Sequence, residues 1–244
     1  MSIKDNLLLV RQQITAAAER AGRDPREIKL VGVIKNVPNE LVIEALENGL
    51  ADIGENRVQE AGARFEMIRA RFPNITWHMI GHLQRNKVGH AIDIFDIIHS
   101  VDSERLAREI EIEMEMRNRE PFPVLVEINT SGEETKYGIP AENAIEFLKN
   151  LSKFKNLKVQ GLMTMAALTD DPEKARLCFR RLKELSEKVK ALNFPRVEMR
   201  YLSMGMSDDF SAAIEEGSNL VRVGRAIFQS ARSKGDDQNG RKHF

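Results

Sequence analysis

The stretch IKLVGVI, residues 28–34, followed by PNELVIEALENG, residues 38–49, decides the fold of this chain. The first run is short, apolar and rich in β-branched residues, which is typical of a buried strand. The second carries apolar residues at helical spacing between Pro38 and Gly49. The same pair of patterns recurs along the chain. Further predicted strands lie at 51–54, 75–81, 97–101, 123–129, 157–165, 200–205 and 219–224, each followed by an amphipathic stretch.

Eight strand and helix units follow one another, which predicts right-handed crossovers and a parallel sheet. We therefore expect an α/β protein, a (β/α)8 barrel of the TIM type. An open doubly wound sheet with six or seven strands would accept the same pattern and stays an alternative. Before the first unit, apolar residues at Ile3, Leu7, Val10 and Ile14 lie on one helical face, so an extra N-terminal helix is predicted, stopped by Gly22.

No Pro, Gly and Ser-rich linker divides the sequence, so a single barrel domain over residues 1–233 is predicted. Residues 234–244, within the tail SKGDDQNGRKHF, are polar and lack any period. This tail is expected to be unstructured.

Composition narrows the class of protein. Lys plus Arg and Asp plus Glu are 37 each, and no basic stretch is interleaved with aromatic residues, so nucleic acid is not an expected partner. No apolar run approaches the ~20 residues that span a bilayer. The one cysteine, Cys178, fits a reducing compartment. A cytoplasmic protein without membrane contact is expected.

Polar residues collect where the predicted strands end. In either fold the functional face lies at the carboxyl ends of the strands. The first strand ends at Lys35 and the third at Gly81 and His82. The other ends fall at Glu55 to Arg57, Ser100 and Asp102, Asn129, Met163 and Thr164, Ser203 to Ser207, and Arg222 to Arg225. In a barrel these ends meet at one mouth.

Two of the ends suggest an anion site. The segments SMGMSDD, 203–209, and VRVGRAIF, 221–228, place small residues in turns that lead into helices, where backbone N–H groups are free to receive phosphate oxygens. Barrels commonly bind phosphate in the loops after strands seven and eight, where both segments fall. Alternatively, Ser207 is only a helix N-cap, and Asp208 and Asp209 complement the helix dipole.

Lys35 is a candidate nucleophile. An amine at the end of a buried strand should be partly desolvated, and that burial, with cations such as Arg222 nearby, would favour its neutral form. A neutral amine can attack an aldehyde to form a Schiff base, while the anion site across the mouth would hold a phosphate on the same compound. A plain surface lysine is the alternative. No histidine shows paired metal-ligand spacing, so no metal is predicted.

Seven motifs together resemble a known family. They are IKNVP (34–38), GENRVQE (54–60), WHMIGHLQRNK (77–87), KYGI (136–139), GLMTM (161–165), SMGMSDDFSAAIEEGS (203–218) and VRVGRAIF (221–228). In order and spacing they resemble the pyridoxal phosphate homeostasis proteins, from about residue 3 to residue 230. The resemblance implies a barrel similar to the N-terminal domain of alanine racemase, of the fold-type III class that binds pyridoxal 5′-phosphate (PLP).

The resemblance also implies a role for individual residues. Lys35 would carry PLP as a Schiff base. Ser207 and the N–H groups of Gly224 and Arg225 would hold the phosphate, with Ser203 nearby. Arg222 would face the pyridine nitrogen, and the ring would be surrounded by Asn56, His82 and Met163. The chain departs from the family pattern at Ile34, Asn36, Asn219 and Gln229.

The resemblance leads us to expect a cofactor carrier without evident turnover. An arginine opposite the pyridine nitrogen disfavours ring protonation and weakens the electron sink that demanding chemistry needs. Only Tyr137 and Tyr201 could serve as tyrosine bases, and the racemases' second, β-domain is not expected here. Expected partners are PLP, amino acids and PLP-dependent apo-enzymes, and a monomer is expected. A weak PLP-dependent racemase and a cofactor-free Schiff-base aldolase are the alternatives.

Overall fold

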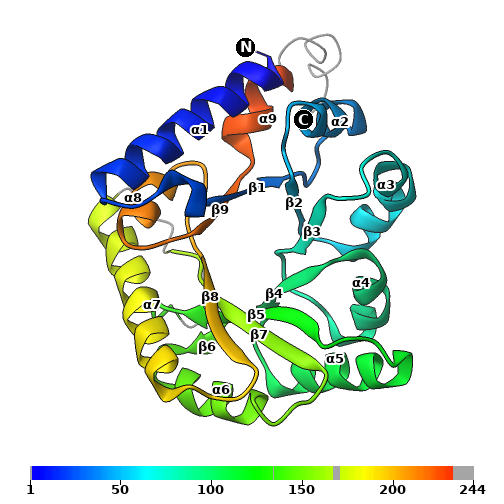
Figure 1. Cartoon of the computed structure of the whole chain (residues 1–244), viewed down its shortest axis with the longest axis vertical. Helices are drawn as coiled ribbons and strands as arrows, with labels where there is room; N and C mark the ends of the chain where they lie inside the picture. The colour runs from blue at the N-terminus through cyan, green and yellow to red at the C-terminus, as the bar shows by residue number, and fades with distance from the viewer. Residues whose placement is uncertain (1, 134, 167–170, 233–244) are drawn as a thin grey trace, which may run out of the picture.

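In the computed structural model, residues 2–133, 135–166 and 171–232 are described, and within them eight parallel strands close into a barrel. The strand order is β4, β3, β2, β1, β9, β8, β7, β5, and a further pairing of β4 with β5 closes the ring. Figure 1 shows this ring with the helices around it. The strands are β1 (Lys29–Val33), β2 (Asp52–Glu55), β3 (Thr76–Met79), β4 (Ile97–Val101), β5 (Phe122–Asn129), β7 (Leu157–Met163), β8 (Val197–Ser203) and β9 (Leu220–Val223).

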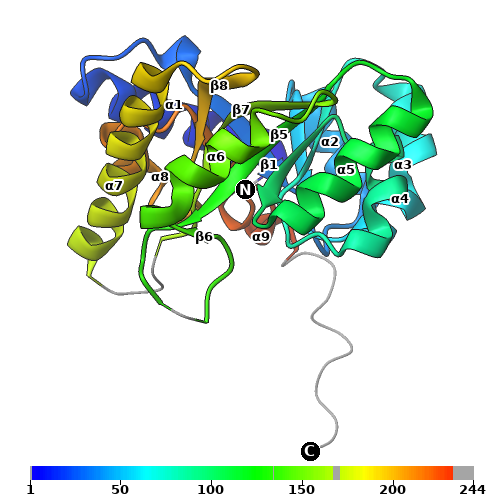
Figure 2. The ribbon, with the colours of Figure 1, turned by 90° about the horizontal axis from the view of Figure 1, so that it is seen from below.

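The helices lie on the outside of the ring, where all but the first and the last connect successive strands. They are α1 (Ile3–Arg20), α2 (Asn39–Glu47), α3 (Val58–Arg71), α4 (Val88–Ile94), α5 (Glu104–Arg117), α6 (Ala144–Leu151), α7 (Pro172–Leu192), α8 (Phe210–Glu215) and α9 (Arg225–Arg232). Short 3-10 turns lie at 25–27, 85–87 and 141–143. A two-residue strand, β6 (Ile139–Pro140), pairs with the end of β5, and the loop before it projects at one end of the barrel (Figure 2).

The N-terminal helix is held on the outer layer by a cap and by burial. Ser2 and Asp5 form a reciprocal capping box at the start of α1. The apolar stripe of α1 packs on α8, α9 and α2. Figure 1 shows α1 beside α8 and α9. The side-chain amide of Asn6 donates a hydrogen bond to the backbone oxygen of Ile227, which ties α1 to the last helix.

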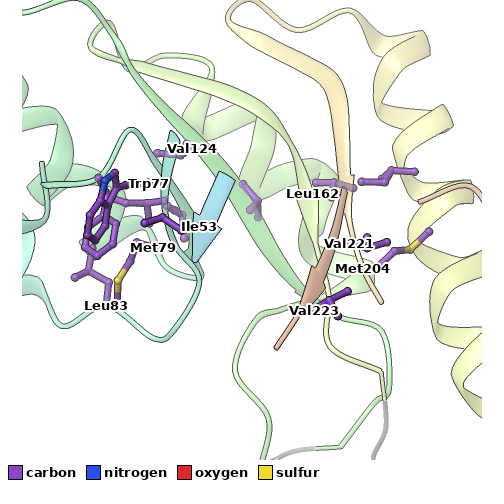
Figure 3. Close-up of a cluster of buried hydrophobic side chains, with 14 of the residues drawn as sticks. Ile53, Trp77, Met79, Leu83, Val124, Leu162, Met204, Val221 and Val223 are labelled. Carbon is purple, nitrogen blue, oxygen red and sulfur yellow. The ribbon is translucent and has the colours of Figure 1, made fainter. Parts of the chain in front are cut away.

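Most of the apolar core lies between the strands and the helices. Figure 3 shows Trp77, Ile53 and Met79 in one part of this layer, and Leu162, Met204 and Val221 in another. Trp77 is fully buried and meets Phe65 and Phe95 edge to face. Because the outward strand positions fill this layer, the inward positions are free to carry polar groups.

The barrel and the N-terminal helix predicted from the sequence are confirmed, and the open sheet is not what forms. The predicted strand at 97–101 matches β4, whereas β8 begins three residues before its prediction. The proposed tail, 234–244, lies outside the described residues. No described helix is long and apolar enough to cross a membrane.

Candidate functional site

Lys35 lies in the turn that follows β1, beyond the buried Ile34. Its neighbour Asn36 adopts the left-handed conformation, with φ of 55°, which asparagine tolerates better than most residues. The expectation that Lys35 would be partly buried is wrong, because its side chain is exposed. The strand ends at Val33, so the lysine stands on the rim of the barrel and not inside it.

The end of β1 is directly beside the end of β9. The two strands pair in parallel with Gly32 opposite Val223, so Lys35 and Gly224 follow neighbouring strand ends. A Cβ built on Gly224 would stand 3.3 Å from the backbone oxygen of Val33. Gly224 and Arg225, which belong to the predicted anion site, therefore follow the strand next to β1 and not a strand on the far side of the barrel.

Arg222 lies inside the barrel and is 4% exposed. Its Nη1 donates to the hydroxyl of Ser203 at 2.6 Å and to the backbone oxygen of Ser203 at 2.7 Å, and its Nη2 donates to the backbone oxygen of Thr164 at 3.0 Å. Burial lowers the pKa of Arg222 to about 10, so the guanidinium remains charged at neutral pH. Three hydrogen bonds fix the direction of this charge.

The loops after β8 and β9 meet. The hydroxyl of Ser207 accepts a hydrogen bond from the backbone N–H of Ala226, in the first turn of α9, at 3.4 Å. Asp208 pairs with the side chain of Arg225. Ser207 does not cap α8, whose N-cap position is Asp209, so the N-cap alternative does not hold.

The first turn of α9 has donors to offer. Within the described part of the chain, the backbone N–H groups of Gly224 and Arg225 have no hydrogen-bond acceptor. Free N–H groups at a helix start, with a nearby serine hydroxyl, are the arrangement that receives phosphate oxygens. These backbone N–H groups and the hydroxyl of Ser207 thus fit a phosphate group at this end of the barrel.

Asn56 and His82 follow the ends of β2 and β3, which lie on the other side of β1 from β9. Gly81 packs against Asn56 so closely that a Cβ on it would stand 2.4 Å from the backbone oxygen of Asn56. The ring of His82 stacks on Tyr137 with centroids 4.2 Å apart, and its Nδ1 lies 3.3 Å from a carboxylate oxygen of Asp102. A cavity of about 550 Å³ is lined by Asn56, His82 and Tyr137 among others.

Met163 and Tyr201 lie in the barrel interior. Met163 is 1% exposed and packs with Ile97, Leu125 and Tyr201. Tyr201 also lines a cavity with Lys29 and Asp52, the first residues of β1 and β2, and so faces the amino-terminal mouth. Of the two tyrosines, only Tyr137 is at the end of the barrel where Lys35 lies.

Two buried acidic residues lie near the site, and the sequence patterns assigned neither of them a role. Glu55, at the end of β2, is fully buried, and burial raises its pKa to about 7 against the opposing charges of Arg64 and Lys35. Its Oε1 has no hydrogen-bond partner within the described residues. Burial likewise raises the pKa of Glu127 on β5 to about 7, with Asp102 adding to the rise.

Two departures from the family pattern have structural roles. Ile34 is fully buried in the core. The side chain of Asn219 accepts from the N–H of Leu202 at 2.8 Å and donates to the oxygen of Arg200 at 2.7 Å. Asn219 therefore joins β8 to β9 near the amino-terminal mouth, far along the barrel from Lys35. Among the described residues, no group of three His, Cys, Asp or Glu side chains is placed to hold a metal.

Comparison with known proteins gives consistent matches over nearly the whole chain. The family described as alanine racemase, N-terminal domain, matches residues 6–231. The pyridoxal phosphate homeostasis protein of Aquifex aeolicus is 40% identical over 228 residues, covering 93% of this chain and 98% of that protein. The solved structure of PipY from Synechococcus elongatus with PLP bound is 30% identical, has a TM-score of 0.81, and is covered in full by 93% of this chain.

The fold also extends to more distant enzymes. Alanine racemase from Clostridium difficile has a TM-score of 0.70 at 20% identity, and the match covers 91% of this chain and 56% of that one. At this identity the likeness concerns the fold alone.

Proposed function

Since this chain belongs to the pyridoxal phosphate homeostasis protein family, within the alanine racemase N-terminal domain family, we propose that it binds PLP through Lys35 and acts in the homeostasis of that cofactor. PLP supplies an aldehyde, with which an amine forms a reversible imine. The residues below are those that would hold the cofactor.

The observation that supports this proposal best is the side-by-side placement of Lys35 and the start of α9 at the ends of β1 and β9. The aldehyde and the phosphate arm of PLP leave neighbouring carbons of the pyridine ring. A ligand of that shape suits an amine and an anion cradle on neighbouring strands. Ser207 and the N–H groups of Gly224 and Arg225 would receive the phosphate.

The other site residues would orient the ring. Arg222, held by Ser203 and Thr164, would present a fixed cation to the pyridine nitrogen. Asn56 and His82 would line the ring on the side of β2 and β3, and Met163 would support it from the buried interior.

We favour a carrier over an enzyme because of two features. A permanently charged Arg222 keeps a facing pyridine nitrogen unprotonated, which weakens the ring as an electron sink. Racemisation also needs an acid and a base on opposite faces of the substrate carbon. Tyr201 faces the other mouth, and Tyr137 is stacked on His82, so neither stands ready as that second base.

The proposal is tested by spectroscopy and peptide mapping. Purified protein mixed with PLP should gain a visible absorption band, and borohydride reduction should fix a pyridoxyl group on the peptide that contains Lys35. Lys35→Ala should abolish the adduct, while Lys29→Ala, at the other mouth, should retain it. A stable pyridoxyl group at another single site in Lys35→Ala would contradict the assignment.

The alternatives have separate readouts. Chiral analysis of amino acids incubated with the PLP-loaded protein would reveal a racemase, which is expected to turn over at ~1 to 10³ s⁻¹. Absence of the visible band with PLP, together with retro-aldol cleavage of an added substrate, would favour a cofactor-free aldolase.

A further inference from the structure

A continuous chain of hydrogen bonds crosses the interior of the barrel from its amino-terminal mouth to Arg222. Lys29 Nζ lies 2.8 Å from Asp52 Oδ1, and the same oxygen lies 2.9 Å from His78 Nε2. His78 Nδ1 lies 2.9 Å from His99 Nε2. His99 Nδ1 lies 3.0 Å from the hydroxyl of Ser203, which receives Arg222 Nη1 at 2.6 Å.

The two histidines within this chain of hydrogen bonds are neutral at pH 7. His78 is 2% exposed and His99 is fully buried. Burial lowers the pKa of His78 and, still more, the pKa of His99, and the guanidinium of Arg222 adds to the fall at His99. Each ring therefore has one N–H donor and one bare nitrogen acceptor.

The two ends of this chain of hydrogen bonds determine which ring nitrogen of each histidine carries the proton. Lys29 can only donate, so Asp52 Oδ1 is an acceptor. Burial by itself would raise the pKa of Asp52, but hydrogen bonds from His78 and Lys29 outweigh it and hold that pKa below its ordinary value. A carboxylate accepts only, so His78 must donate from Nε2 and accept at Nδ1.

The same reasoning continues to the site. Since His78 Nδ1 accepts, His99 must donate from Nε2, which leaves His99 Nδ1 as an acceptor for the Ser203 hydroxyl. The oxygen of Ser203 is then free to accept from Arg222, which also can only donate. Every donor has an acceptor in this one direction. With the opposite tautomer at His99, the Ser203 oxygen would face two donors and its own proton would lose its acceptor.

We propose that His99 is a positioning residue of the cofactor site, which fixes Ser203 and Arg222 in one hydrogen-bonding arrangement, and that Asp52 at the opposite mouth sets the direction of the chain through His78. This inference rests on the proposed function, because it assigns Arg222 to the pyridine ring. It adds a control point at the far end of the barrel that touches no part of the PLP site.

The first test uses the protein without PLP. Long-range ¹H–¹⁵N correlation spectra of the histidine rings should show His78 and His99 both protonated on Nε2 and bare at Nδ1, with neither ring charged at pH 7. A proton on Nδ1 of His99, or a charged ring at either residue, would overturn the proposal whatever the protein does with PLP.

The second test compares two variants of similar shape at Asp52. Asp52→Asn retains an acceptor oxygen, and Lys29 forces that oxygen into place because an ammonium cannot accept. Asp52→Leu removes the acceptor. We expect Asp52→Asn to bind PLP with the wild-type Kd and absorption maximum, and Asp52→Leu to raise Kd about tenfold with a displaced maximum.

A matched pair at His99 separates positioning from packing. His99→Leu removes the acceptor for Ser203 and should raise Kd for PLP about tenfold, with the same displaced maximum as Asp52→Leu. Leu125→Val trims another fully buried interior residue and should leave both quantities unchanged. Equal Kd and equal spectra in Asp52→Leu, His99→Leu and wild type would overturn the positioning role. Failure of wild-type protein to acquire PLP on Lys35 would instead overturn the proposed function and this inference with it.

Discussion

The backbone oxygen of Val33 lies 3.3 Å from the place that a Cβ on Gly224 would occupy, so the ends of β1 and β9 leave little room for a side chain at position 224. This contact brings the rim that carries Lys35 against the first turn of α9. Lys35 therefore follows the strand next to the N–H groups that we propose to hold the phosphate, and the space around Gly224 should matter for PLP binding.

Gly224→Ala should weaken PLP binding. The added methyl group would stand 3.2 Å from the Cβ of Val33, a tight contact that a small shift of the start of α9 would relieve. That shift would move the N–H groups of Gly224 and Arg225 away from the proposed phosphate position. We expect Kd to rise about tenfold, measured by absorption titration. Gly62→Ala, in the middle of α3 with only an ordinary contact at 3.5 Å, is the control and should bind PLP normally. Unchanged affinity in Gly224→Ala would place the phosphate elsewhere.

Ser207→Ala should weaken binding of PLP but not of pyridoxal, which lacks the phosphate. The hydroxyl bridges to Ala226 and would donate to a phosphate oxygen, a charge-assisted bond worth about 1.5 kcal/mol. The ratio of Kd for pyridoxal to Kd for PLP should fall about tenfold. Ser152→Ala, whose hydroxyl donates to Lys149 at the end of α6, is the control. An equal loss for both ligands would show that Ser207 supports the ring and not the phosphate.

Glu55 should make stability fall as pH rises. Its pKa is about 7 in the folded protein against an ordinary value of 4.5 for a glutamate. Between these values the native state binds more protons than the unfolded state, so the free energy of unfolding decreases as pH rises. The full effect above pH 7 is about 3 kcal/mol.

Glu55→Gln isolates this effect from the histidines, whose lowered pKa values act in the opposite direction below about pH 6.5. In urea unfolding at pH 5 and pH 8, the variant should gain stability relative to wild type as pH rises. An equal difference in unfolding free energy between the two proteins at both pH values would contradict this role of Glu55.

Gly161→Ala should destabilise the barrel by about 3 kcal/mol or more. Gly161 has φ of 151°, and a Cβ on it would stand 1.9 Å from the backbone oxygen of Tyr201 on β8, a clash that no side-chain motion can relieve. In Gly89→Ala, on α4, the new Cβ meets only the far ends of two flexible side chains, the carboxylate of Glu113 at 3.3 Å and Nη2 of Arg117 at 3.4 Å. Thermal unfolding should show a large drop in Tm for the first variant and little change for the second.

Much of the barrel could be predicted because its buried strands are nearly continuous apolar runs. β4 is IIHSV over its whole length and is buried at every position, so its limits were predicted correctly. The start of β8 was not, because VEMR at 197–200 alternates exposed and partly buried positions and carries two charges. A strand that begins at an exposed rim lacks the apolar signal.

The site was less accessible to sequence reasoning for a different physical reason. Motifs indicated Lys35, Ser207 and Arg222, but the exposure of Lys35 depends on where β1 stops, which a pattern does not define to the residue. The sequence patterns assigned no role to His78, His99 or Asp52. Their hydrogen bonds join residues separated by 21 to 104 positions, and only the closed ring brings them together.

The position of Lys35 on the rim of the barrel has a consequence for how a PLP carrier would release the cofactor. The exposed amine lies beyond the end of β1. If Lys35 holds PLP as proposed, a second amine can therefore approach the former aldehyde carbon of PLP from solvent while every strand remains paired. The rates of PLP binding and of its transfer to a second amine should then be limited by diffusional encounter, without any opening of the barrel.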